Sequence, residues 1–397
     1  MDRSKLASFL AGSGTDGYLF DTVGFDANQY YLTDFTAPDG VVSLHTPEDD
    51  HVLTTTLEYG RAESESSADT VAIRADYGER DLRGEYGKDE AINRVIGRFL
   101  ADHDVDAVSV PAEFPVGTAD SLRDQGVDVD PVTADVFDEI RAVKRDEEVE
   151  RIRAVQAANE EAMATVERLL REATVADGSG DVAAGTLVHD GEPLTSERVK
   201  TEVEVTLLRE RCGLDEAIVA CGADGTEPHN RGSGPLVAGE PIVVDIFPKS
   251  KETRYYGDMT RTFVKGQPGD RAREWYDLTR EAFEAALDAV QAGATGADVH
   301  AAACDVYEDA GLPTLRSDPD AETGFIHSTG HGVGLEIHED PRLDMHNDDP
   351  LQVGQVITVE PGLYDPEVGG IRIEDLVVVA EEGYENLTDY PVEFVVE

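Results

Sequence analysis

Carboxylates inside apolar, strand-like runs are the feature of this sequence that most constrains its fold. Asp245 lies in IVVDIF, Glu374 lies in IRIEDL, Asp258 directly precedes a strand-like run, and Glu360 ends another. Burying a lone carboxylate in a strand is costly unless it is paired or binds a metal. Any one of them alone would more often be a salt-bridged strand residue. Four of them beside a histidine segment predict a buried site assembled from distant strands.

Three of the ten histidines, His327, His331 and His338, lie in FIHSTGHGVGLEIHED. His331 has a glycine on each side, so its backbone can come close to a ligand. The nearby glycines favour an extended or looped segment over a helix. Imidazole is a common metal ligand, and four carboxylates with one imidazole suit two divalent cations. Oxygen-rich ligation favours Mn²⁺, Co²⁺ or Fe²⁺, with Zn²⁺ also compatible.

A pair of metals about 3.5–4 Å apart can hold a bridging hydroxide and polarise a carbonyl, as in aminopeptidases. Asp245 and Asp258 are expected to meet across a hairpin whose turn is Lys249–Tyr256. Without cations the carboxylates would repel one another. We therefore expect a poorly formed site in the metal-free protein.

The net charge of the chain argues against nucleic-acid binding. The 397 residues include 84 acidic and 33 basic side chains, which gives a net charge of −51 that repels nucleic acid. The excess is spread among ordinary apolar runs, which predicts a folded protein whose acidic surface is adapted to high salt. An ordinary acidic enzyme is the alternative. The sequence shows no signal peptide or membrane anchor, and its three cysteines lack CxxC spacing, so we expect a cytoplasmic protein.

The pattern along the chain predicts two domains, 1–138 and 139–397. The first alternates strand-like and helix-like pieces and has no dense cluster of catalytic groups. Its expected strands are 17–20, 29–32, 41–44, 51–55 and 107–110, with a helix at 89–101.

The second domain is expected to be α+β, with an antiparallel sheet covered by helices. Its expected helices are 146–174, 196–211, 270–292 and 298–310, with a surface loop at 177–191. Its expected strands are 241–247, 259–264, 355–359 and 371–379.

The order of the five candidate ligands resembles that of the pita-bread metallopeptidases, which include Xaa-Pro aminopeptidases, Xaa-Pro dipeptidases (prolidases), methionine aminopeptidases and creatinase. The resemblance is strong over 140–397. The segment QYYLTDF at 29–35 more weakly resembles the creatinase/prolidase-type amino-terminal domain. The resemblance implies a C-terminal pita-bread domain plus a smaller N-terminal α/β creatinase-like domain. The two aspartates are thirteen residues apart here, two more than is usual in prolidase-like members.

The same resemblance implies a role for each metal ligand. Asp245 would bind one metal, and Asp258 and Glu374 would bridge both. His331 and Glu360 would complete the shell of the other metal. Glu360 would also act as general base and then general acid on the bridging water.

Other side chains also receive roles from the resemblance. His338 would stabilise the gem-diolate, His327 would help to enclose the substrate proline, and His229 in EPHN would aid proton transfer. Arg372 would orient the ligand carboxylates. The alternatives are a surface ion pair for His338 and a solvated loop position for His229. Tyr364 is expected to be an ordinary strand residue.

The resemblance implies a two-metal peptidase that acts on small peptides with proline at the second position, as an aminopeptidase or a dipeptidase. It also implies a homodimer. The additional amino-terminal domain argues against a methionine aminopeptidase, and the intact ligands argue against creatinase. A non-catalytic peptide-binding protein on the same fold, or an amidinohydrolase, is the alternative.

Overall fold

The computed structural model describes residues 3–133, 136–179 and 182–397. The chain divides into two compact units, Met1–Arg141 and Ala142–Glu397. Within the described ranges, no helix has both the length and the apolar character needed to cross a bilayer. Each unit has sheets and apolar cores of its own.

The first unit is built on a six-stranded mixed sheet with the order β4-β3-β2-β1-β5-β6. Its strands are β1 (Gly17–Gly24), β2 (Ala37–His45), β3 (Asp50–Thr54), β4 (Thr70–Ile73), β5 (Ala107–Pro111) and β6 (Asp128–Val132). Its helices are α1 (Arg3–Ser13), α2 (Ala27–Thr33), α3 (Tyr59–Glu65), α4 (Glu79–Tyr86), α5 (Lys88–Asp102), α6 (Val116–Asp124) and α7 (Val136–Ala142).

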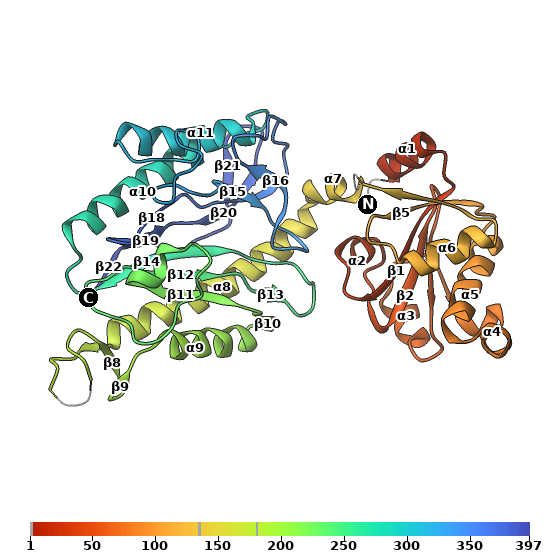
Figure 1. The fold of residues 1–397 in the computed structure, drawn as a ribbon, viewed down its shortest axis with the longest axis horizontal. Helices are drawn as coiled ribbons and strands as arrows, with labels where there is room; N and C mark the ends of the chain where they lie inside the picture. The colour runs from red at the N-terminus through yellow and green to blue at the C-terminus, as the bar shows by residue number, and fades with distance from the viewer. Residues whose placement is uncertain (1–2, 134–135, 180–181) are drawn as a thin grey trace. The chain divides into compact units, whose positions relative to one another are not determined.

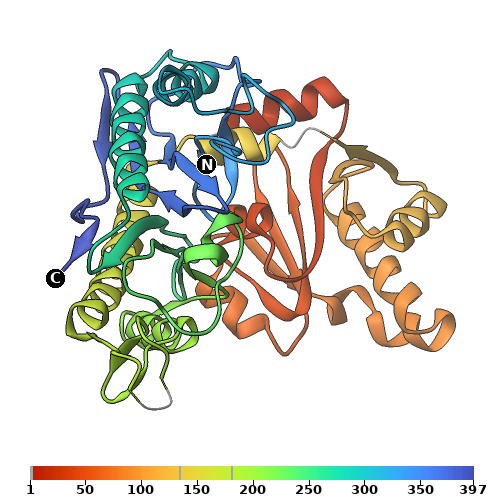
Figure 2. The ribbon, with the colours of Figure 1, turned by 60° about the vertical axis from the view of Figure 1, so that its left-hand side comes forward.

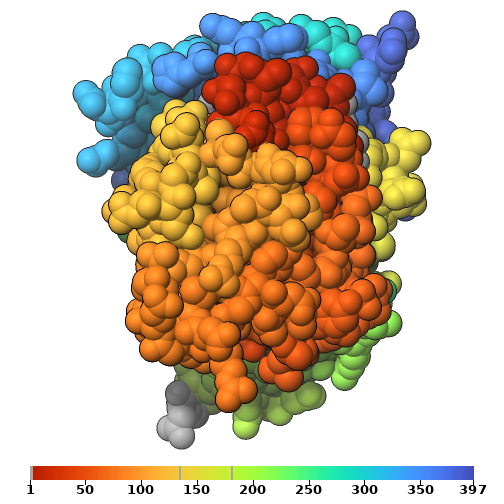
Figure 3. All heavy atoms as spheres, turned by 90° about the vertical axis from the view of Figure 1, so that its right-hand side faces the viewer, coloured from red at the N-terminus to blue at the C-terminus, as the bar shows by residue number. Residues whose placement is uncertain are grey.

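Both faces of this sheet are covered, which explains why β1 begins with an unbroken apolar run. Leu19 packs in a core with α4, α5 and α6, the helices that form much of the surface in Figure 3. Its neighbours Tyr18 and Phe20 point the other way, into a core shared with α1, α2 and α7. The alternation along one strand therefore supplies both cores.

The predicted strand at 29–32 is wrong, because these residues belong to helix α2. The side chain of Asp26 caps this helix by accepting a 2.8 Å hydrogen bond from the Gln29 backbone N–H. Tyr30 and Tyr31 gave the segment a strand-like composition. The N-cap outweighs that composition, since it satisfies a backbone donor that the first helical turn leaves open.

The second unit contains two larger sheets with four long helices. The first sheet has the order β11-β12-β14-β22 and the second the order β16-β15-β17-β20-β21. Strands of the first are β11 (Ala217–Cys221), β12 (Ile242–Ile246), β14 (Met259–Lys265) and β22 (Val395–Val396). Strands of the second are β15 (Gly330–Gly332), β16 (Glu339–Leu343), β17 (Val356–Val359), β20 (Asp375–Val379) and β21 (Tyr384–Asn386).

Shorter strands complete the unit in two-stranded and three-stranded sheets. They are β7 (Thr174–Val175), β8 (Leu187–His189), β9 (Glu192–Pro193), β10 (Cys212–Gly213), β13 (Lys249–Ser250), β18 (Gly362–Asp365) and β19 (Gly369–Arg372). The 177–191 segment, predicted as a surface loop, thus ends in a short strand, and its positions 180–181 lie outside the described residues.

Two pairs of amphipathic helices cover these sheets, each through its apolar stripe. Helices α8 (Asp146–Glu172) and α9 (Ser196–Arg209) share a core with β12 and β14, and α10 (Asp270–Ala289) and α11 (Gly296–Asp309) share another with β17 and β20. The two pairs lie apart in both ribbon views (Figures 1 and 2). The predicted α+β fold, with antiparallel pairing between the main strands and helices covering them, is confirmed.

The single strand predicted at 371–379 is two strands. The chain leaves β19, which pairs with β18, and enters β20, which pairs with β17. Ile373 and Glu374 form the crossing between them. This change of partner releases the backbone of Glu374 from either ladder, and its N–H donates instead to the carbonyl of Thr260 at 3.1 Å.

Candidate metal centre

The two aspartates lie on the predicted hairpin. Strand β12 pairs with β14 antiparallel, with Asp245 opposite Thr260, and Asp258 directly precedes β14. Val244 and Ile246 point into the core beneath α8 and α9, so Asp245 points to the opposite face. The alternation of the strand therefore directs one carboxylate away from the apolar core and toward a polar site.

Three further ligand candidates converge on this site from the second sheet. His331 lies on β15, Glu360 follows β17, and Glu374 lies between β19 and β20. His331 Nε2 is 3.3 Å from Glu360 Oε1 and 3.8 Å from Asp258 Oδ2. Ligand atoms of Asp258, His331 and Glu374 all lie within 4.8 Å of one another. Residues more than a hundred positions apart in sequence thus form one buried cluster.

Glycines on both sides of His331 permit this approach. A Cβ on Gly330 would lie 2.0 Å from the carbonyl oxygen of Thr358, and one on Gly332 would lie 2.2 Å from that of Asp340. No side chain fits at either position. His331 Nδ1 donates to the carbonyl of Gly332 at 3.1 Å, which leaves Nε2 facing the carboxylates.

Arg372 and Thr260 form hydrogen bonds with two of the candidate ligands, Asp245 and Glu374. Arg372 Nη2 donates to Asp245 Oδ2 at 2.6 Å, and Arg372 Nε donates to Thr260 Oγ1 at 3.2 Å. Thr260 Oγ1 in turn donates to Glu374 Oε2 at 2.7 Å. The second oxygen of Asp245, Oδ1, is buried and has no hydrogen-bond partner within the described residues. A bound cation or a proton would offset the desolvation of this buried carboxylate oxygen.

The electrostatics of the acids are unequal. Burial, followed by repulsion from neighbouring carboxylates, raises the pKa of both Asp258 and Glu374 well above the ordinary values. Burial also raises the pKa of Asp245, against the attraction of Arg372. Burial acts on Glu360 as well, but its hydrogen bond to His331 and nearby positive charges prevail and hold its pKa at about 2. Burial and mutual repulsion therefore disfavour the ionised forms of Asp258 and Glu374 in the metal-free protein.

The remaining predicted histidines surround this cluster. The rings of His331 and His338 meet edge to face, with centroids 4.4 Å apart. Burial is the main cause that lowers the pKa of His327 and of His338 to about 4, and His229 lies close enough to both to contribute to the shift. His229 and His338 are exposed, whereas His327 is half-buried.

Tyr364 is more than an ordinary strand residue, so that expectation is wrong. Its hydroxyl accepts a 2.9 Å hydrogen bond from Arg372 Nη1 and lies 3.1 Å from His327 Nε2. His327 Nδ1 donates to the carbonyl of Ser328 at 2.7 Å, so Nε2 is the acceptor for the tyrosine proton. Tyr364 therefore links the arginine behind Asp245 to the histidine beside the cluster.

Comparison with known families fits this geometry. Residues 150–381 match metallopeptidase family M24, and residues 3–143 match the creatinase/prolidase N-terminal domain. The chain belongs to metallopeptidase family M24. Membership makes this M24 metallopeptidase a hydrolase whose family uses divalent metal ions, and it confirms the resemblance to the pita-bread enzymes.

Relatives of this M24 protein include several named peptidases. It is 33% identical to the Xaa-Pro dipeptidase of Pyrococcus furiosus over 64% of this chain and 65% of the relative, just under two thirds of that protein. It is 34% identical to the probable dipeptidase PepE of Mycobacterium tuberculosis over 72% of this chain and 68% of the relative. The fold also matches the crystal structure of the X-Pro aminopeptidase from Thermotoga maritima, with a TM-score of 0.80 and 25% identity over 100% of each chain.

The donor set of this M24 centre fits divalent cations. Among the described residues, a carboxylate oxygen without a hydrogen-bond partner, two carboxyl groups with strongly raised pKa values and the Nε2 atom of His331 all face one site. The assignment of individual ligands to individual metals stays a prediction.

Some residues that shape this M24 centre were not foreseen in the sequence. The side chain of Gln156 on α8 pairs with the backbone of Asp258, accepting from its N–H and donating to its carbonyl, both at 2.9 Å. Lys144 and Glu339 form a buried ion pair at 2.8 Å next to His338. A polar Gln on the apolar stripe of a predicted helix was the one visible signal.

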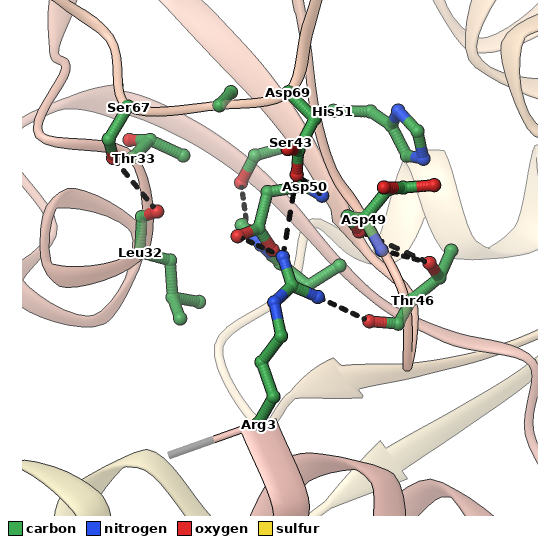
Figure 4. A network of polar contacts seen from close by, with 12 residues as sticks. Arg3, Leu32, Thr33, Ser43, Thr46, Asp49, Asp50, His51, Ser67 and Asp69 are labelled. Atoms are coloured by element: carbon green, nitrogen blue, oxygen red, sulfur yellow. Dashed lines mark hydrogen bonds and ion pairs between the residues drawn. The ribbon is translucent and has the colours of Figure 1, made fainter. Parts of the chain in front are cut away.

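A serine, a histidine and an aspartate are also aligned in the first unit of this M24 protein. His45 lies 2.7 Å from Asp50 and 2.9 Å from Ser43. Arg3 donates to Asp50 and to the carbonyl of Thr46 (Figure 4). Ser43 and His45 are completely buried. No substrate reaches such a hydroxyl, so the alignment is structural.

Proposed function

We propose that this metallopeptidase hydrolyses Xaa-Pro bonds in small peptides. The observation that carries the proposal is the buried cluster of Asp258, His331 and Glu374, with ligand atoms within 4.8 Å of one another, in a chain of family M24. Relatives named Xaa-Pro dipeptidase and X-Pro aminopeptidase support the choice of bond. Peptides of different length decide whether the chain acts on dipeptides or on longer substrates.

Five side chains would hold two divalent cations, with Mn²⁺ or Co²⁺ preferred and Fe²⁺ or Zn²⁺ compatible. They are Asp245, Asp258, His331, Glu360 and Glu374. When bound, the cations supply Lewis acidity that polarises the peptide carbonyl and lowers the pKa of water. Cations need the ionised forms of Asp258 and Glu374, whose pKa values burial and repulsion raise, so we expect cation binding to weaken as the pH falls.

Glu360 is the carboxylate of the cluster that most readily stays ionised in the metal-free protein. Its pKa of about 2 leaves it ionised at neutral pH, and His331 and Thr358 hold its Oε1 atom. An ionised carboxylate held in place can take a proton from the attacking water and pass it to the leaving proline nitrogen.

The histidines around the cluster would have distinct tasks. His338 is neutral at physiological pH because its pKa is about 4, so it can donate a hydrogen bond to an oxyanion without being a cation. Both ring nitrogens of His327 are engaged, by Ser328 and Tyr364, which suits a wall against the proline rather than a proton carrier. His229, exposed and close to both, would contact the substrate.

Arg372 would position the centre without touching the reacting atoms. It is buried, and it holds Asp245, Thr260 and Tyr364 in one network. Burial alone would lower the pKa of Arg372, but the Tyr364 hydroxyl and the nearby carboxylates raise it, so Arg372 stays charged. A fixed positive charge behind the acids orients their oxygens toward the cations.

The decisive experiment measures peptide turnover by metal-free protein to which Mn²⁺ or Co²⁺ is added, at low and high salt. Xaa-Pro dipeptides, longer Xaa-Pro peptides and matched Xaa-Gly peptides are compared, and Asp258→Asn serves as the control. We expect metal-dependent cleavage of Xaa-Pro peptides that the variant lacks. Peptide binding without any turnover would refute the peptidase and favour a binding protein.

A further inference from the structure

A pocket of about 370 Å³ lies beside the metal centre, on the hairpin that joins the two aspartates. Apolar side chains from Phe247, Tyr256 and Ile337 line it together with basic side chains from Lys249, Lys251 and Arg254. None of these residues belongs to the metal centre described above. The pocket includes β13, labelled in Figure 1.

The pocket is built on the hairpin that carries two of the ligand carboxylates. Phe247 is two residues after Asp245, and Tyr256 is two residues before Asp258. Two lining residues of the pocket therefore lie close in sequence to the ligand aspartates. Tyr256 N–H also donates to the carbonyl of Gly334 at 2.8 Å, which ties the pocket to the segment that carries His338.

The basic residues are unusual for this chain. Three of the six residues at 249–254 are basic in a protein with 33 basic and 84 acidic residues. Asp215 and Glu216 also line the pocket. Arg231 pairs with Glu216, and Asp215 attracts Lys249. Within the described part of the chain, Lys251 and Arg254 form no ion pair.

Like charges are held together in this pocket. Burial and then the positive charge of Arg254 lower the pKa of Lys249. Cations that repel one another favour an anion between them. Lys249 Nζ lies over the aromatic ring of Tyr256, 5.0 Å from its centroid, so an apolar surface lies next to the basic groups.

The turn presents Arg254 rigidly and in a strained conformation. Its φ of 66° is left-handed, which residues with a side chain seldom adopt. The backbone of Arg254 donates to the Ser250 carbonyl at 3.1 Å, while Ser250 Oγ accepts from Glu252 and Thr253 N–H at 3.2 and 3.0 Å. Backbone strain held by its surroundings is a feature of ligand-binding sites.

We propose that this pocket is a subsite for a carboxylate of the peptide substrate, bound by Lys251 and Arg254 with Lys249 beside them. The proposal rests on the proposed peptidase function and specifies its substrate class. An acidic side chain on the residue before proline, or the free carboxyl terminus of a dipeptide, supplies the same chemistry. A carboxylate attached to a short aliphatic or ring segment suits the mixed apolar and basic lining.

Two pairs of peptides separate these sources of the carboxylate. Glu-Pro against Gln-Pro tests the side chain, and Leu-Pro against Leu-Pro amide tests the terminus. We expect roughly tenfold higher kcat/KM for the carboxylate member of at least one pair, because hydrogen bonds to charged groups are worth about that much when partly screened. The preference should be lost in Lys251→Gln/Arg254→Gly, with kcat/KM for the uncharged peptide unchanged.

Arg254→Gly suits this test because glycine adopts a positive φ without strain, so the variant should fold. Arg273→Gln, an exposed charge on α10, is the matched control and should keep the preference. A wild-type protein without either preference, or a double variant that retains them, would overturn the subsite.

A second measurement does not depend on turnover. Metal-free protein is titrated calorimetrically with all four peptides. Tighter binding of a carboxylate member by the wild type than by the double variant supports the subsite even if no Xaa-Pro peptide is cleaved, which would refute the proposed function alone. Equal affinities in wild type and double variant refute the subsite.

Discussion

Replacing Asp258 with asparagine should stabilise the metal-free protein while it removes the response to metal. In the metal-free protein, ligand oxygens of Asp258 and Glu374 lie within 4.8 Å of each other, and both residues are buried. Coulomb's law for unit charges at that separation of 4.8 Å gives about 3.5 kcal/mol with an effective dielectric constant of about 20. The asparagine amide would keep the shape of the side chain without its charge.

Proton uptake by the wild type limits the repulsion between the two carboxylates. We therefore expect Asp258→Asn to raise the free energy of unfolding of the metal-free protein by about 1–3 kcal/mol at neutral pH. Burial and repulsion raise the folded-state pKa of Asp258 above its unfolded value. The bound proton therefore stabilises the fold at low pH, and that stability is lost as the pH rises through the folded-state pKa. The advantage of the variant should accordingly shrink from about pH 8 to about pH 5.

Urea unfolding followed by tryptophan fluorescence measures the effect in the unit that holds the centre. Trp275 is the single tryptophan, lies on α10 and is 3% exposed in the core of the second unit. Urea is uncharged and does not screen the carboxylates. With chelator present the variant should unfold at higher urea than the wild type, and added Mn²⁺ should stabilise the wild type alone.

A variant that is no more stable than the metal-free wild type would refute the predicted repulsion. If Asp258→Asn is as stable as the chelated wild type or less stable at all pH values, the carboxylates do not repel one another in the metal-free protein. Stabilisation of the variant by Mn²⁺ to the wild-type extent would show that Asp258 is not a ligand.

Other predictions test single contacts. Arg261→Met should lower the free energy of unfolding by about 3–5 kcal/mol in the same urea assay, because it leaves the buried Asp375 without its 2.8 Å partner. Adding Asp375→Asn should recover part of this loss. A loss below about 1 kcal/mol would contradict the prediction. Burial alone would raise the pKa of Asp50, but its histidine and arginine partners hold the pKa below its ordinary value. The stability that these partners provide should therefore be lost as the pH drops below about 4. In Asp50→Asn, acid unfolding followed by circular dichroism should depend less on pH in this range. Tyr364→Phe should lower kcat/KM about ten- to hundredfold through Arg372, with metal content unchanged by atomic absorption.

Much of the fold was predictable because local patterns act on local structure. Apolar stripes predicted the helices of the second unit, and the two apolar runs around Asp245 and Asp258 predicted their hairpin. The mistaken strand at 29–32 had a local signal against it, the capping Asp26. The strand broken at Glu374 had none, because the break arises when the chain exchanges β18 for β17 as its partner.

The sequence predicted the acids and histidines of the candidate site but not the residues that hydrogen-bond to them. A carboxylate in an apolar strand is conspicuous, since burial makes it costly. Thr260 and Tyr364 are ordinary residues for strands, and only the polar Gln156 on an apolar helix stripe stood out. Thr260 contacts Glu374 across 114 positions, Gln156 contacts Asp258 across 102, and Tyr364 contacts His327 across 37. No periodicity in one sequence encodes such a pairing.

Helix α8 sets the order in which the centre can be assembled. Gln156 near its middle holds the backbone of Asp258 and also donates to Thr388 at 2.8 Å, 232 positions away in sequence. Closing such long loops comes late in folding, because chain entropy must be lost before the contacts form. We therefore expect metal supply to change the yield of active protein more than its folding rate.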